Sequence, residues 1–299
     1  MNYPIWDVPL IGGGMVIAII AIVHVFVSHF AIGGGLYLVL TERTARKTGD
    51  AALLQFAKDH TRFFILVVLV LGAVTGVGIW WSIALVNPEA TSTLIHVFVW
   101  VWATEWVFFF VELTAAMLYY YGWDKMDARS HMAIGWIYAV SAWCSLVLIN
   151  GILTFMLTPG RWVESQSVWD GFFNPGMLPS MFIRTAACIA LAGLYALITG
   201  TLVRDEKARE RIVRYSAKWV MAGIIVMPFF GAWYVAVLPP MAWEITMGGA
   251  PAVTPSASTS CMAHASAPSG CTPTARSAMM PNGLPAPSAA VCAAAHCAS

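Results

Sequence analysis

The residues that could do chemistry in this sequence are a few ionisable side chains inside long apolar segments. His24 lies near the middle of one such segment, and Glu105 and Glu112 lie in another. Ionisable groups in a membrane-spanning helix are costly, so each is a functional candidate by default. An imidazole in this setting can ligate a haem iron, relay protons or form a packing hydrogen bond. His24 alone leaves these three roles open.

Glu105 and Glu112 are seven residues apart, which is about two helical turns, so both carboxyl groups lie on one helix face. Neither can face lipid, so each must be protonated, paired or reached by internal water. Asp124 lies at the polar end of the same segment. The three acids predict a path for protons from the inside water to the middle of the membrane. The alternative is two protonated glutamates that only form hydrogen bonds between helices.

The remaining ionisable residues lie nearer the ends of apolar segments. His29 follows His24 by five residues, or about 140° around a helix, so the two imidazoles do not share a face. His96 and His131 fall near membrane interfaces, where an imidazole costs little, and we expect no chemistry from them. Arg184 opens the fifth apolar segment.

The elements that must position these residues are membrane-spanning helices. Of the 299 residues, 59% are hydrophobic and 10% are charged, and the mean hydropathy is +0.73. A soluble domain carries about 25% charged residues, so soluble enzymes, disordered chains and disulfide-stapled scaffolds are excluded. The sequence predicts an all-α, polytopic membrane helix bundle, because six segments reach the length of about 20 residues that a span needs. These segments are 11–40, 63–86, 92–121, 131–157, 179–203 and 215–238.

The basic residues predict how this bundle is oriented. The links after spans 1, 3 and 5 hold 13 of the 16 Lys and Arg residues. Such links lie on the cytoplasmic side, so both termini are expected on the outer side of the membrane. The expected location of the protein is the inner (cytoplasmic) membrane of a bacterium or archaeon. The net charge of +1 implies no nucleic-acid partner.

The composition changes near the C-terminus and predicts two regions, a transmembrane bundle over 1–241 and a low-complexity outside tail over 242–299. From residue 250 onward the chain is rich in Ala, Ser and Pro and has no Lys, Asp or Glu. One interpretation is a disordered tail. The other is an out-of-frame translation that begins after residue 254.

Four motifs, taken in order, resemble subunit I of cytochrome bd-type quinol oxidases over residues 15–200, about the first half of such a subunit. The most specific motif combines a glutamate, Gly-Trp-Asp and His-Met at the family's spacing. The motifs are His24 to Gly33 followed by Glu42; Gly72-Ala-Val-Thr75-Gly76; Glu105 to Glu112 leading to Gly122-Trp123-Asp124-Lys125 and His131-Met132; and Asn150-Gly151.

The resemblance implies roles for individual positions. His24 matches the family's axial ligand for the high-spin haem b, and Glu112 and Asp124 match its proton-path acids. Glu105 lies one position from a family glutamate beside the high-spin haems. Arg184 stands where the family has a histidine ligand for its low-spin haem. Arginine stays protonated and cannot bind iron, but it can pair with a haem propionate.

The expected function is therefore a subunit that binds haem b and transfers electrons in a membrane respiratory oxidoreductase. By resemblance, electrons would pass from a quinol or an external c-type cytochrome toward O2 or another acceptor, with proton uptake from the inside. The family's later spans and quinol-binding loop have no match here, so other membrane subunits are expected as partners. The alternative is a non-redox proton or ion pathway, or a scaffold without haem. We expect His24 and Glu105 to face each other across a bundle of the first four spans.

Overall fold

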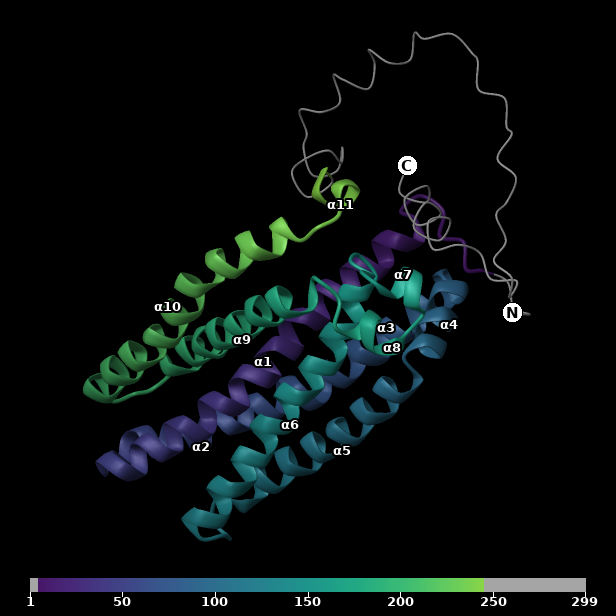
Figure 1. Cartoon of the computed structure of the whole chain (residues 1–299). Coiled ribbons are helices and arrows are strands. Elements are labelled where there is room, and N and C mark those ends of the chain that lie inside the picture. The colour runs from purple at the N-terminus through teal and green to yellow at the C-terminus, as the bar shows by residue number, and fades with distance from the viewer. Residues whose placement is uncertain (1–4, 245–299) are drawn as a thin grey trace, which may run out of the picture.

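The computed structural model describes residues 5–244, and the elements of that range are helices (Figure 1). The long helices run side by side, and short helices cap one end. In chain order the elements are α1 (Gly13–Thr48), α2 (Ala51–Ile65), the π-helical η1 (Leu66–Leu71), α3 (Gly72–Val86), α4 (Pro88–Val97), α5 (Val99–Gly122), α6 (Ala128–Phe155), α7 (Trp162–Ser165), α8 (Val168–Phe172), α9 (Met177–Gly200), α10 (Glu206–Ala236) and α11 (Pro240–Glu244).

Six helical stretches are long and apolar enough to cross a membrane, which confirms the predicted bundle. The second stretch consists of α2, η1 and α3, which continue into one another over Ala51–Val86. Three helical stretches extend well beyond the predicted spans, because hydropathy detects only the apolar part of a helix. α1 continues to Thr48, the second stretch already begins at Ala51, and α10 already begins at Glu206. The predicted third span is divided at the buried Phe98, which separates α4 from α5.

α1 is the central helix of the bundle. It packs against α2, α3, α6 and α9, while α5 pairs with α6 and α10 pairs with α9. Glycines on α1 allow this close packing. A Cβ atom at Gly33 would lie 1.9 Å from the carbonyl oxygen of Cys188 on α9, and one at Gly35 would lie 2.1 Å from the Tyr138 ring on α6.

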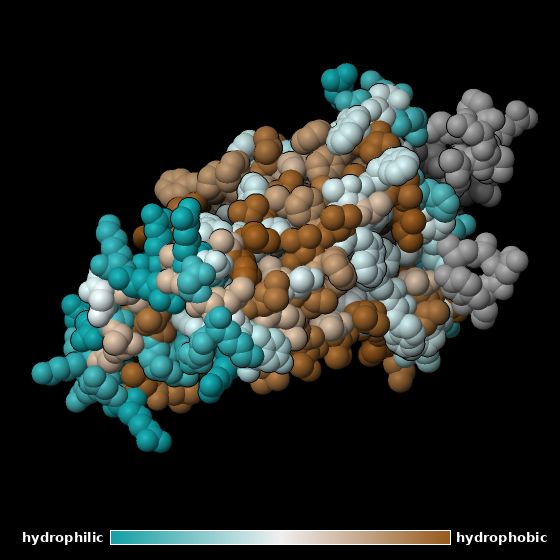
Figure 2. Space-filling view, turned by 90° about the horizontal axis from the view of Figure 1, so that it is seen from below, coloured by the Kyte–Doolittle hydropathy of each residue, from teal (hydrophilic) through white to brown (hydrophobic). Residues whose placement is uncertain are grey.

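One end of the molecule is polar. The turns that join α1 to α2, α5 to α6 and α9 to α10 all lie at this end (Figure 1), and hydrophilic side chains gather there (Figure 2). These turns carry the basic links, so we call this the basic end. The start of α1 and the helix α11 lie at the opposite end. The two ends of the described segment therefore lie on one side, and the outside location of the termini stays a prediction.

The predicted tail, residues 242–299, lies outside the described residues except for its first three positions. The two interpretations of this tail stay predictions.

Candidate functional site

The His24 side chain on α1 is held by a hydrogen bond to α3. Its Nδ1 lies 2.9 Å from Oγ1 of Thr75. That hydroxyl lies 2.6 Å from the carbonyl oxygen of Leu71, one turn earlier. Because a carbonyl only accepts, the hydroxyl proton points to Leu71, and His24 Nδ1–H donates to Thr75. The lone pair of His24 is therefore on Nε2, in the tautomer that binds a metal through this nitrogen.

The backbone of α3 leaves room for the His24 ring. A Cβ atom at Gly76 would lie 3.3 Å from Cε1 of His24, so a larger residue there would crowd the imidazole. The π-helical turn η1 directly precedes Gly72 and Thr75, and such turns are frequent at functional sites. The Gly72–Gly76 motif thus supplies both the hydrogen bond and the space that fix His24.

Glu105 and Glu112 both point from α5 toward α6. Glu105 accepts a hydrogen bond from the Ser145 hydroxyl at 2.9 Å. Glu112 lies 3.2 Å from the Tyr138 phenol oxygen, which also lies 3.0 Å from the carbonyl oxygen of Ala31 on α1. The shared face predicted from the seven-residue spacing agrees with these contacts. The Tyr138 phenol has only one proton to donate to these two acceptors, Glu112 and the Ala31 carbonyl. When the phenol donates to Ala31, Glu112 can carry a proton itself and donate it to the phenol oxygen.

The structure does not join His24 and Glu105 in one hydrogen-bonded group. His24 bonds to α3 and Glu105 bonds to α6. Across residues 5–244, no hydrogen bond or ion pair connects the two side chains. Each side chain has a partner on a different neighbouring helix, and the expectation that the two face each other across the bundle stays a prediction.

Asp124 lies at the basic end, as predicted, in the turn between α5 and α6. Its carboxylate is 75% exposed and forms an ion pair with Lys58 of α2, with Nζ at 2.6 Å and 2.7 Å from the two oxygens. In the described part of the chain no hydrogen bond links Asp124 to Glu112. A proton path between them would need water or a movement of side chains.

Glu42 is the centre of a buried polar cluster that the sequence reasoning did not predict. Its carboxylate is 0% exposed and accepts hydrogen bonds from Tyr119 Oη at 2.8 Å and from Nε of Arg46 at 2.8 Å. His131 Nδ1 lies 2.9 Å away, and its Nε2–H donates to the Tyr119 carbonyl oxygen. His131 is 1% exposed, although we expected it at a wet helix end. The cluster joins α1, α5 and α6.

A second missed residue is His60 on α2, which is 1% exposed. Its Nδ1 lies 2.8 Å from Oγ1 of Thr199 on α9, and its ring stacks on Phe56. Among the described residues its Nε2 has no hydrogen-bond partner. Helical spacing could have indicated both missed residues, because Glu42 follows the buried Leu38 by four positions and His60 follows Phe56 by four.

Arg184 lies on α9, where it opens the fifth span as predicted. Its Nε lies 3.3 Å from the Ser180 hydroxyl, which in turn donates to the Asn150 side chain of α6 at 2.7 Å. Over residues 5–244, no carboxylate lies within 4 Å of the guanidinium. Arg184 is therefore a half-buried cation with no ion-pair partner from this part of the chain, and it can accept an anionic group.

Comparison with known proteins agrees with the motif-based resemblance. A profile of the cytochrome bd terminal oxidase subunit I family matches residues 15–238. The chain belongs to this family. The match confirms the predicted membership and extends it beyond residue 200, through α10.

Two relatives illustrate the likeness. A Bacillus subtilis (strain 168) protein with the provisional name cytochrome bd menaquinol oxidase subunit I is 23% identical over 223 residues, which are 69% of this chain and 48% of that protein. The bd oxidase structure from Geobacillus thermodenitrificans matches with a TM-score of 0.66 at 19% identity, over 75% of this chain and 54% of that one. The latter likeness shows the fold. The chain spans about half the length of these relatives.

Proposed function

We propose that this bd-family chain is a membrane subunit that binds haem b through His24 and takes part in respiratory electron transfer. The observation that carries this proposal is the fixed tautomer of His24. Its Nδ1–H donates to Thr75, so Nε2 carries the lone pair, and the missing side chain at Gly76 leaves room for the imidazole ring itself. Ligating histidines usually have their second nitrogen bound in this way. The donor set therefore fits a haem iron, and haem b, when bound, supplies one-electron redox chemistry.

Arg184 is the residue best suited to hold a haem propionate or a similar anion. It is half-buried, and the residues described here offer it no carboxylate. A guanidinium binds a carboxylate through two parallel hydrogen bonds. Its role would be to orient an anionic group near α9, while iron ligation falls to His24.

The acidic residues of α5 would deliver protons from the basic end. Asp124 is exposed there and is held by Lys58. Glu112 and Glu105 lie deeper, on the face that contacts Tyr138 and Ser145 of α6. Each of these contacts is able to hold a proton on or near a carboxyl group. In this proposal Asp124 takes up protons, and Glu112 and Glu105 hold them within the membrane.

Partners and donors follow from the family. The Bacillus subtilis relative is named for a menaquinol oxidase, and we infer a quinol as donor for this chain's assembly, with an external c-type cytochrome as the other candidate. O2 is the inferred acceptor. The chain spans about half the length of its relatives, and from the family we infer other membrane subunits of an oxidoreductase complex as partners. The location would be the cytoplasmic membrane of a bacterium or archaeon, with both termini outside.

A reduced-minus-oxidised absorption spectrum tests haem binding. The purified full chain should show the Soret and α bands of a b-type haem, and His24→Ala should lose them or shift them. His96→Ala is the matched control, because His96 is exposed on α4 and bonds only within that helix. A chain without these bands, or an unchanged spectrum in His24→Ala, would refute the proposal.

A second candidate is a proton pathway without haem, and the bonds of Glu105 and Glu112 favour it because they need no iron. Proteoliposomes that contain haem-free protein distinguish the two candidates. The second function predicts a proton flux that Glu112→Gln abolishes and that the exposed variant Glu89→Gln leaves unchanged. The absence of flux in haem-free vesicles would exclude it.

A further inference from the structure

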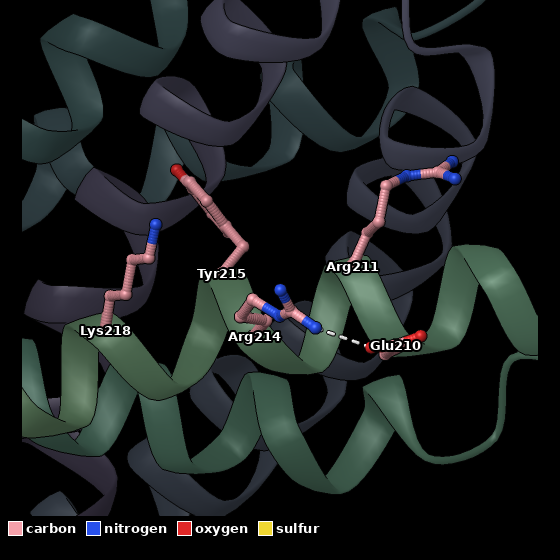
Figure 3. A pocket seen from close by; sticks show the side chains of 5 residues that line it. All are labelled: Glu210, Arg211, Arg214, Tyr215 and Lys218. Carbon is pink, nitrogen blue, oxygen red and sulfur yellow. Dashed lines mark hydrogen bonds and ion pairs between the residues drawn. The ribbon is translucent and has the colours of Figure 1, made fainter.

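The first turns of α10 carry a basic pocket whose lining does not include His24, Glu105 or Glu112. Arg211, Arg214, Tyr215 and Lys218 follow the spacing of one helix face and line, with Glu210, a pocket of about 310 Å³. Figure 3 shows Arg211, Tyr215 and Lys218 pointing to the same side of α10. Three cations and one carboxylate give the pocket an excess of positive charge.

The ion pairs of this pocket leave its charge available to a ligand. Arg214 pairs with Glu210 at 2.5 Å, and Arg211 lies 3.4 Å from the Asp50 carboxylate. Both side chains of the Arg214–Glu210 pair are exposed, as is Arg211, and ion pairs of exposed side chains contribute little to stability. Lys218 has no carboxylate within 4 Å among the residues that the structure describes. An incoming anion would therefore find one free cation and two that are weakly engaged.

The pocket lies where α10 passes from polar to apolar sequence. Lys218 is the last charged residue of the helix, and the segment from 219 to 236 has none. The same helix face continues beyond Lys218 with Met221 and Ile225, which are 54% and 56% exposed. This face therefore presents cations at the basic end and, one and two turns further along the helix, the exposed apolar side chains of Met221 and Ile225, which we call the apolar strip. A ligand that matches both parts has an anionic head and hydrocarbon chains.

We propose that this face of α10 binds an anionic phospholipid, with its phosphate in the basic pocket and its acyl chains along Met221 and Ile225. Basic pockets at the ends of membrane helices bind such headgroups, and arginine contacts phosphate through two hydrogen bonds. The long side chain of Lys218 can reach the headgroup while its methylenes stay in the apolar layer. The site is independent of haem binding, because none of its residues belongs to the His24 region.

Lipid titration of the full-length, delipidated chain in detergent, followed by native mass spectrometry, tests this site. Phosphatidylglycerol should bind more tightly than phosphatidylcholine. Lys218→Gln and Arg214→Gln should each weaken phosphatidylglycerol binding about fivefold, the ratio that ~1 kcal/mol per basic side chain gives. The matched controls are Lys207→Gln and Arg204→Gln, which remove the same charges from exposed positions outside the pocket. Both controls should bind as the unmodified chain does.

Three results would overturn the proposal. Equal losses in the pocket and control variants would mean a general effect of surface charge. Equal affinity for the two lipids would mean that no anionic headgroup is recognised. Competition by inorganic phosphate at millimolar concentration, with the same dependence on Lys218, would assign the pocket to free phosphate and leave the apolar strip without a role.

Discussion

The chemistry of His24 depends on which of its nitrogens carries the proton. Thr75 decides this, because its hydroxyl gives its proton to the Leu71 carbonyl and can only accept from the imidazole. A neutral imidazole with a free Nε2 is the form that ligates iron. Thr75, which lies 51 residues away in the sequence, therefore matters to the proposed haem ligation as much as His24 itself.

Replacement of Thr75 by valine tests this assignment. The Thr75→Val side chain keeps its shape but cannot accept the Nδ1–H hydrogen bond. We expect haem affinity to fall about 10- to 100-fold, as for other residues that orient a metal-binding histidine. Haem titration followed by absorption measures this. Thr104→Val, at an exposed threonine that bonds only to its own helix, should bind haem normally, and equal affinities for the two variants would contradict the assignment.

The buried Glu42 cluster stabilises the packing of α1, α5 and α6. Glu42→Gln removes the negative charge that faces Arg46 and His131 and disturbs four hydrogen bonds inside the protein. Breaking a buried pair on one side costs about 3–5 kcal/mol. The thermal unfolding midpoint of Glu42→Gln should therefore fall well below that of the exposed control Glu89→Gln. Equal midpoints would show that the cluster does not hold α1, α5 and α6 together.

Among the elements, α1 sets the packing of the bundle. Its glycines lie against α9 and α6 at distances that no side chain would allow. The polar residues of α1 also depend on this packing, because Glu42 reaches Tyr119 and His131 only while α5 and α6 stay close. A change in the contact between α1 and α9 should therefore disturb the whole bundle.

Addition of a methyl group to α1 at Gly33 tests whether the bundle depends on the contact between α1 and α9. In Gly33→Ala the added Cβ would lie 1.9 Å from the Cys188 carbonyl oxygen, so the helices would have to separate. We expect a large loss of folded protein in size-exclusion chromatography. In Gly14→Ala the added Cβ meets nothing within 4 Å, and helix propensity favours alanine by about 1 kcal/mol. Folding of Gly33→Ala at the yield of Gly14→Ala would show that this contact is dispensable.

The sequence predicts the spans well and the contacts between them poorly. Apolar segments long enough for a bilayer indicate six helices, and the spacing of Glu105 and Glu112 predicts their shared face. Hydropathy cannot show where a helix continues into water, so the sequence misplaces the end of α1 and the starts of α2 and α10. The pairing of Glu42 with His131 joins residues 89 positions apart. Such a contact follows from the packing of three helices and has no local pattern, which is why the sequence predicts only that His131 lies near a membrane interface.

At the scale of the whole molecule, large apolar faces stay uncovered. Trp100, Trp106 and Phe110 on α5 are exposed, as are Met221 and Ile225 on α10. Exposed apolar surface of this extent is expected to meet lipid or other membrane subunits. These uncovered faces of α5 and α10 fit helices that span a membrane.

The most direct test of the account is chemical rescue of the His24 ligand. We predict that His24→Ala, purified with haem added, lacks the ferrous iron–histidine stretch in resonance Raman spectra, and that free imidazole restores it. The unmodified chain and the His96→Ala control should show the band without imidazole. An iron–histidine band that persists in His24→Ala would contradict the account, because another residue would then hold the iron.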